Sequence, residues 1–144
     1  MSGEGDEQVE REERLGTGGD VRLVVPAAPE YLRLVRLTAA GLASRLGFTF
    51  DEVEDLRIAV DELCFHLLGD VDDDDDPFDE PRTMDLTYSA GRDSITITGR
   101  TGLIGPVPEP SELSEQILDA LVDEHAVSGD DSVITFRLKK QRES

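Results

Sequence analysis

The sequence has little cysteine and no long apolar run, and each shortage excludes a class of protein. The single cysteine, Cys64, cannot form an intrachain disulfide, so we interpret it as a small core residue. No apolar stretch approaches the roughly 18 residues that a membrane-spanning helix requires. We also expect no signal peptide. The chain is therefore predicted to be cytoplasmic and to have no contact with a membrane.

Cationic side chains are also scarce. The chain has 14 Lys and Arg against 33 Asp and Glu, which gives a formal net charge of −19. Direct binding to nucleic acid is not expected, because contacts to phosphate require Lys and Arg. An acidic surface suits a basic protein partner, such as the DNA-binding region of a transcription factor. Plain solubility is the alternative explanation for the charge.

The sequence does contain enough apolar residues for one core. Its 144 residues, of which 38% are hydrophobic, suit a single domain. Residues 1–20 are almost free of apolar side chains and are expected to be a disordered tail, so the domain is predicted to span residues 21–140. The acidic stretch 69–82 fails the register of an EF-hand. We interpret it as a solvated connector, with weak cation binding or contact with a partner as alternatives.

The most informative segment is a predicted helix over residues 49–68. Thr49 and Glu52 have the spacing of a capping box at its start. Residues at helical spacing predict a buried stripe of Val53, Leu56, Val60, Cys64 and Leu67. A second, mixed face carries Asp55, Ala59, Glu62 and His66. Because Glu62 and His66 are four residues apart, their side chains can share one site.

The remaining patterns predict the element order β-α-α-β-β-α-β. The strands are expected at residues 21–25, 83–89, 94–98 and 132–139, and the outer helices at about 29–46 and 111–122. Residues 99–110 are predicted to be a loop and residues 128–131 a turn. If all helices cover one face of a mixed, mostly antiparallel sheet, the fold is an α+β two-layer sandwich.

Three stretches of the chain carry a resemblance to a known family. They are VPAAPEYL from Val25, RLTAAGLASRLG from Arg36 and DEVEDLRIAVDELC from Asp51. These stretches resemble the bacterial anti-sigma factors of the RsbW and SpoIIAB type, which are serine kinases built on the histidine-kinase-like ATPase fold. The resemblance is close over residues 21–67 and loose beyond. It implies that fold, a sigma factor and an anti-sigma-factor antagonist as partners, and a homodimer formed through the first strand and first helix.

The resemblance also implies a nucleotide site of four pieces, only one of which this sequence retains. In the family a helical Glu is the general base and an Asn holds Mg²⁺; Glu62 matches the Glu, and His66 replaces the Asn. The segment GRTGLIG replaces the Asp-x-Gly-x-Gly motif that reads adenine, so that Gly102 and Gly105 remain without the Asp. Residues 112–114, Glu-Leu-Ser, replace the Gly-Leu-Gly that meets phosphate.

Because three of the four pieces of the family's nucleotide site are replaced, we predict a domain that has no kinase activity and uses no ATP or Mg²⁺. An active ATP-dependent serine kinase of the antagonist is one alternative, and an interaction module that shares only the fold and binds some other partner is another. Glu62 is then a vestigial general base, and His66 a hydrogen-bonded residue at the pocket edge. Zinc held by Glu62 and His125 is a further alternative, without a close-spaced ligand motif. The resemblance implies that Arg36 binds the partner, with Arg33 a less specific candidate; otherwise Arg36 is a solubilising surface residue.

Overall fold

Five strands and three α-helices make up the part of the chain that the computed structural model describes, which comprises residues 20–68, 82–102, 110–130 and 133–143. In chain order the elements are β1 (Asp20–Pro26), the 3₁₀ turn η1 (Pro29–Tyr31), α2 (Leu32–Arg45), α3 (Phe50–Leu68), β2 (Thr83–Ala90), β3 (Ser94–Gly102), α4 (Glu112–Leu121), β4 (Glu124–Asp130) and β5 (Val133–Gln141). Residues 1–19 of the predicted tail (1–20) and most of the acidic stretch (69–81) lie outside the described residues, whereas Asp20, assigned to the tail, is the first residue of β1. No helix among the described residues is long and apolar enough to cross a membrane.

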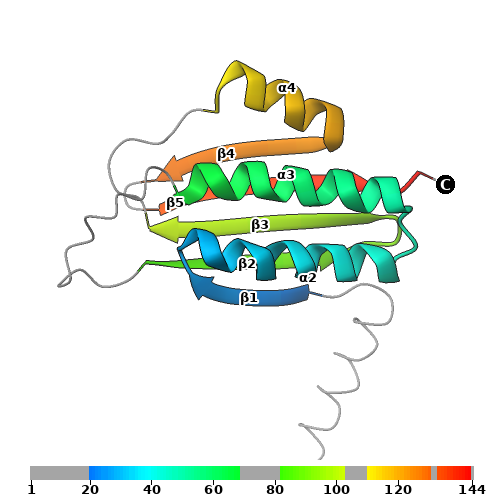
Figure 1. Ribbon diagram of the computed structural model, residues 1–144, viewed down its shortest axis with the longest axis horizontal. Coiled ribbons are helices and arrows are strands. Elements are labelled where there is room, and N and C mark those ends of the chain that lie inside the picture. The colour runs from blue at the N-terminus through cyan, green and yellow to red at the C-terminus, as the bar shows by residue number, and fades with distance from the viewer. Residues whose placement is uncertain (1–19, 69–81, 103–109, 131–132, 144) are drawn as a thin grey trace, which may run out of the picture.

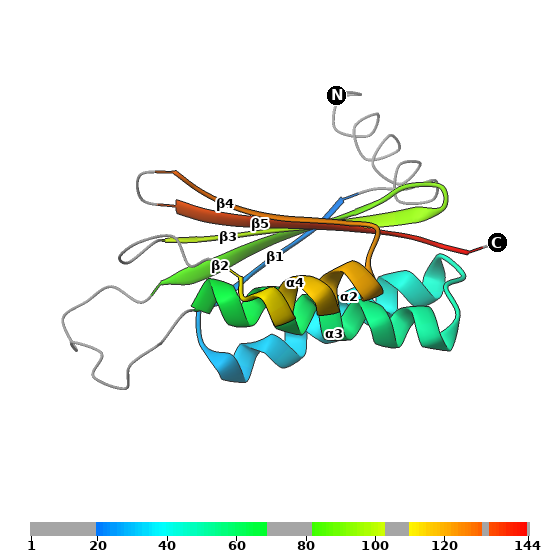
Figure 2. The ribbon, with the colours of Figure 1, turned by 90° about the horizontal axis from the view of Figure 1, so that it is seen from above.

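The strands form one sheet in the order β1-β2-β3-β5-β4. All four pairings between neighbouring strands are antiparallel, so the described sheet is wholly antiparallel rather than mixed. The three helices lie side by side over one face of the sheet, with α3 between α2 and α4 (Figures 1 and 2). The predicted α+β two-layer sandwich is confirmed.

Two predictions for the second half of the chain were wrong. Residues 128–130 of the expected turn (128–131) belong to β4, which pairs with β5 from Glu124↔Lys139 to Asp130↔Val133; residue 131 lies outside the described residues. Strand β3 continues to Gly102, although residues 99–102 were expected to lie in a loop. Within β3, Gly99 pairs with Phe136, and a Cβ at position 99 would collide with the Phe136 ring. A glycine that a cross-strand aromatic ring covers is compatible with a strand, so here glycine did not indicate a loop.

The core lies between the sheet and the helices, largely where the periodicity placed it. From α2 and α3 it includes Leu32, Val35, Ala39, Ala43, Val53, Leu56, Val60 and Cys64. Ala59 is also fully buried, although it was assigned to the mixed face; α3 has a helix on each side, so its buried face is wider than one stripe. On α4 the core residue is Leu118, and Leu113, which lies about 140° around the helix from it, is exposed.

Cys64 is a core residue, as its position on the stripe predicted. It is fully buried in α3. Burial, with a smaller contribution from the charge of Asp61, raises the pKa of the Cys64 thiol to about 12. The thiol is therefore neutral at physiological pH and is a poor nucleophile.

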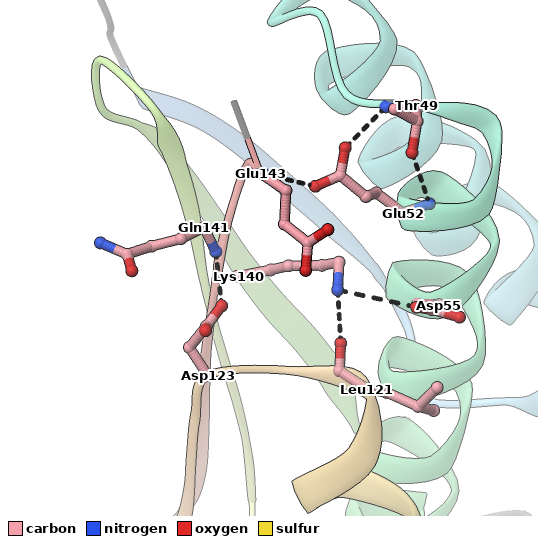
Figure 3. Close-up of polar contacts among 8 residues, drawn as sticks. All are labelled: Thr49, Glu52, Asp55, Leu121, Asp123, Lys140, Gln141 and Glu143. Carbon is pink, nitrogen blue, oxygen red and sulfur yellow. Dashed lines mark hydrogen bonds and ion pairs between the residues drawn. The ribbon is translucent and has the colours of Figure 1, made fainter.

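The predicted capping box at the start of α3 is present and also holds the C-terminal segment (Figure 3). The Thr49 amide donates to Glu52 Oε1 at 2.8 Å, and the Glu52 amide donates to Thr49 Oγ1 at 3.2 Å. The second carboxylate oxygen, Oε2, accepts the amide of Glu143 at 2.7 Å. Glu52 therefore joins the end of the chain to the central helix.

Lys140 of β5 makes a second link in the same region (Figure 3). Its Nζ donates to the carbonyl of Leu121 at 2.6 Å, at the end of α4, and lies 3.8 Å from Asp55 Oδ2 on α3. A cation at the last carbonyls of a helix is favourable because the helix dipole is negative there. The end of β5 thus fixes how α3 and α4 sit on the sheet.

We expect Glu52→Gln to lower the free energy of unfolding by roughly 1 kcal/mol at pH 7, because the charged acceptor of two backbone amides is lost. These hydrogen bonds, that from Thr49 first, lower the pKa of Glu52 below its ordinary value. A lowered folded-state pKa means stability that is complete above about pH 5 and is lost as the pH falls through that pKa. In urea unfolding, the difference in the free energy of unfolding between variant and wild type should therefore be smaller at pH 3 than at pH 7. A difference that is equal at both pH values would contradict this role.

Candidate functional site

The pieces of the predicted nucleotide site gather at one end of the molecule. Figure 1 shows the C-terminal end of α3, the end of β3 and the start of α4 on the same side. Glu62 lies on α3 and is half-buried. His66 lies one turn later on the same helix, but its side chain is outside the described part of the structure, as is all of Gly105. The described site therefore consists of Glu62, Gly102 and the first turn of α4.

Glu62 is held by α4. The hydroxyl of Ser114, a buried residue, donates to Glu62 Oε1. The amide of Ser114 in turn donates to Ser111 Oγ at 3.0 Å, and Ser111 is the N-cap of α4. A general base accepts the proton of a substrate hydroxyl through such a hydrogen bond. Here the carboxylate accepts a hydroxyl of its own chain, and the contact joins α3 to α4.

The start of α4 is electrostatically unsuited to phosphate. Helix N-termini bind phosphate through backbone N–H groups and the positive end of the helix dipole. In α4 the amide of Ser114 is already bonded to the Ser111 cap, and the first turn carries Glu112 and Glu115, which are both exposed. These two carboxylates complement the dipole themselves and would repel a triphosphate.

Arg82 lies at the same end of the molecule and links two of its elements. Its Nη1 donates to the carbonyl of Gly102 at 3.0 Å, and its Nη2 donates to the carbonyl of Leu68 at 3.2 Å. The guanidinium thereby joins the end of β3 to the end of α3. Gly102 is exposed, and among the described residues a Cβ there would meet only Arg82 Cδ, at 3.9 Å, so their packing does not require glycine at this position.

Sequence reasoning missed Arg82, and it placed Ser114 at the implied nucleotide site without finding its hydrogen bond to Glu62. Arg82 had one weak signal, because it is a cation beyond a helix, where carbonyl groups lack partners. The bond between Ser114 and Glu62 had no signal in the sequence, since the two residues are 52 positions apart in the chain.

The described residues contain no group of three or more His, Cys, Asp and Glu side chains placed to hold a metal ion. His125, on β4, has its Nε2 at 2.6 Å from Asp119 Oδ1 of α4. Glu62 is bonded to Ser114 instead. The two residues considered as zinc ligands therefore have different described partners.

Arg36 lies at the contact between α2 and α3. Its Nη1 is 3.3 Å from Asp61 Oδ2, and 34% of its side chain is exposed. The Nε atom is buried and has no hydrogen-bond partner within the described part of the chain. Arg36 is therefore half-buried rather than a freely solvated surface residue, while Arg33, one turn earlier, is exposed.

Large apolar side chains are exposed on the outer side of the same two helices. Leu37 follows Arg36 on α2, and Ile58 and Phe65 precede and follow Asp61 on α3; Phe65 is 70% exposed. Ile58 and Phe65 are seven residues apart and share one side of the helix. Apolar groups clustered around an ion pair of this kind are typical of protein-binding surfaces. We call Arg36, Leu37, Ile58, Asp61 and Phe65 the helical surface.

Three helices over one antiparallel sheet, with a helix-borne glutamate facing the start of the last helix, define an α+β sandwich consistent with the histidine-kinase-like ATPases. No family model matches the chain. A serine-protein kinase RsbW of Halalkalibacterium halodurans is 39% identical over 77 residues, which are 54% of this chain and 44% of the relative. The serine-protein kinase RsbW of Bacillus subtilis (strain 168) is 57% identical over 44 residues, 31% of this chain and 28% of that protein.

The resemblance that the sequence predicted is thus confirmed, and the chain is related to the RsbW serine-protein kinases over the aligned segment. That segment spans less than half the length of either relative.

Proposed function

We propose that the chain is an anti-sigma factor: it binds and sequesters a sigma factor in the cytoplasm, and an anti-sigma-factor antagonist releases that partner. The family resemblance suggests both partners. The observation that carries the proposal is the hydrogen bond from Ser114 to Glu62, because it occupies the implied general base with a group of the same chain. The chain then acts by binding rather than by phosphoryl transfer.

The helical surface supports a role in binding. Arg36 already has part of its guanidinium removed from water, so less desolvation remains when a partner carboxylate approaches it. Leu37, Ile58 and Phe65 supply apolar area beside it. Arg33 adds an exposed cation on α2. A half-buried arginine within an apolar surface is a typical centre of binding energy at an interface.

An active serine kinase is the second candidate. It is favoured by the name of the relatives and by the presence of Glu62 on α3, at the end that faces α4. A kinase needs ATP with Mg²⁺, whereas sequestration does not. The two candidates are therefore separated by their dependence on nucleotide.

The proposal is tested by presenting purified sigma factors of the source bacterium, one at a time, to the immobilised chain in EDTA. We expect one of them to be retained in a stoichiometric amount at about 0.3 M salt, where exposed charge attraction is largely screened. An unrelated protein of equal negative charge is the control for non-specific attraction of basic regions. If no sigma factor is retained, or if the control retains the same ones, the anti-sigma function is refuted.

We also propose a homodimer formed through β1 and α2. Strand β1 is an edge of the sheet, and Val24 on it and Leu34 on α2 are exposed. Burying an unpaired edge together with apolar side chains is favourable. Light scattering at about 50 μM is expected to give twice the chain mass of 15.8 kDa, and Leu34→Asp should shift it to the single-chain value. A wild-type chain that scatters as a monomer would rule the dimer out.

A further inference from the structure

The face of the sheet turned away from the helices is covered by no described element (Figure 2). The alternation of buried and accessible positions on β2, β3 and β5 places every second side chain of these strands on it. Besides Thr83 at the start of β2, four threonines lie there: Thr87, Thr96, Thr98 and Thr135. So do three cations, Arg100, Arg137 and Lys139. We call these seven residues the open face.

The charge of the open face is opposite to that of the chain. Its three cations belong to a chain with a net charge of −19. The one carboxylate on the same side of the three central strands, Asp85, already accepts two hydrogen bonds from Arg22 of β1. Asp20, on β1, is separated from Lys139 by the width of two strands. Asp85 also lies directly opposite Arg100 in the register of β2 and β3, whereas the central-strand residues opposite Arg137 and Lys139 are threonines. Arg137 and Lys139 therefore face solvent with little nearby negative charge from the central strands.

One edge carboxylate approaches the cations. Glu124 of β4 has Oε1 at 3.6 Å from Arg137 Nη1 and Oε2 at 3.7 Å from Lys139 Nζ. Exposed ion pairs at such distances contribute little, so the carboxylate of a ligand can compete with Glu124 for both cations. Glu124 thus competes with a ligand for Arg137 and Lys139, and removing its charge should strengthen binding of the ligand.

The register of β3 against β5 arranges the cations in successive rows. Arg100 lies opposite Thr135, and Arg137 and Lys139 follow two and four residues after Thr135 along β5. Residues on one side of a strand repeat about every 7 Å. An extended peptide presents its alternate side chains at the same interval. Carboxylates at positions i, i+2 and i+4 of such a peptide would therefore match the three rows.

We propose that the open face binds an extended acidic segment of a partner protein, with alternate carboxylates on Arg100, Arg137 and Lys139. One arginine guanidinium can donate two parallel hydrogen bonds to the two oxygens of a carboxylate. The threonine hydroxyls supply further donors beside the cations. Single strands of nucleic acid are the poorer fit, because they bind through aromatic stacking, and the aromatic rings of the central strands, Tyr88 and Phe136, are fully buried. The open face is separate from the helical surface, so one partner can bind each side.

Fluorescence anisotropy of labelled hexapeptides with the full chain at about 50 mM salt tests this proposal. The probes are Glu-Thr-Glu-Thr-Glu-Thr and the block peptide Glu-Glu-Glu-Thr-Thr-Thr. We expect saturable binding of the alternating peptide, at least about fivefold tighter than that of the block peptide. Arg100→Ala or Arg137→Ala should weaken it about tenfold, and Glu124→Gln should strengthen it about threefold. Arg45→Ala removes an equal charge from the end of α2 and should change the affinity less than twofold.

Three results would overturn the proposal. The first is the absence of saturable binding by the alternating peptide. The second is an equal loss of affinity in Arg45→Ala and Arg137→Ala, which would mean that only net charge matters. The third is a labelled oligothymidylate that binds more tightly than the peptide and displaces it. None of these depends on whether a sigma factor binds to the helical surface.

Discussion

Calorimetric titration of the chain with Mg-ATP is expected to give no saturable heat up to about 1 mM. A Kd of about 1 mM corresponds to a binding free energy of only about −4.1 kcal/mol. Glu62 is engaged by Ser114, and Glu112 and Glu115 place negative charge at the start of α4, where the resemblance implies a phosphate contact. The position implied for the Mg²⁺-holding amide is His66, and Mg²⁺ prefers oxygen ligands. Each of these features alone weakens binding, and together they should abolish it.

The serine-protein kinase RsbW of Bacillus subtilis, titrated under the same conditions, is the positive control. The chain should also fail to transfer labelled phosphate to a serine of the antagonist. Micromolar binding of Mg-ATP together with such transfer would contradict the expectation and establish the kinase alternative.

Arg36→Ala is expected to weaken binding of the sigma factor by roughly 2 kcal/mol, about thirtyfold. The guanidinium is the one described cation within the helical surface, and its contact with Asp61 holds it at the junction of α2 and α3. A partner carboxylate that reaches Arg36 gains a charge-assisted hydrogen bond, and the surrounding acidic residues of the chain would repel that carboxylate elsewhere. Surface plasmon resonance with the sigma factor identified in the capture experiment measures the change.

Two variants provide matched controls for Arg36→Ala. Arg45→Ala removes an exposed arginine from the other end of α2 and should leave the affinity unchanged, as should Glu62→Ala at the nucleotide site. Because Arg36 is half-buried, its truncation should lower the free energy of unfolding by no more than about 1 kcal/mol, which thermal unfolding can verify. If Glu62→Ala loses affinity and Arg36→Ala does not, the helical surface is the wrong side of the molecule.

Local sequence signals predicted the first half of the fold well. The capping box of Thr49 and Glu52 and the apolar spacing of α3 depend on residues three or four apart, so the pattern contains the whole interaction. Gly47, two residues after the end of α2, has a φ of 85°, which suits a glycine just beyond the end of a helix. The start of α4 at Ser111 was found for the same reason. These features need no information from distant parts of the chain.

The errors arose where a distant partner decides the structure. Strand β4 is short and polar, and only its pairing with β5 makes it a strand. The glycines at the end of β3 predicted a loop, because the sequence does not show that the ring of Phe136 lies against Gly99. Likewise, the resemblance placed Glu62 in the site, but the hydroxyl that occupies its carboxylate comes from α4. Contacts between segments far apart in sequence leave no periodic trace, so the bond between Ser114 and Glu62 could not be predicted from the sequence.

The central claim is that the chain binds its partner without nucleotide. The measurement that tests it most directly is the Kd of the cognate sigma factor for the wild-type chain, determined once in EDTA and once with about 1 mM Mg-ATP. We predict the same Kd under both conditions, because binding uses the helical surface around Arg36 and not the end of the molecule that Ser114 and Arg82 close. A sigma factor that binds only when Mg-ATP is present would contradict the claim.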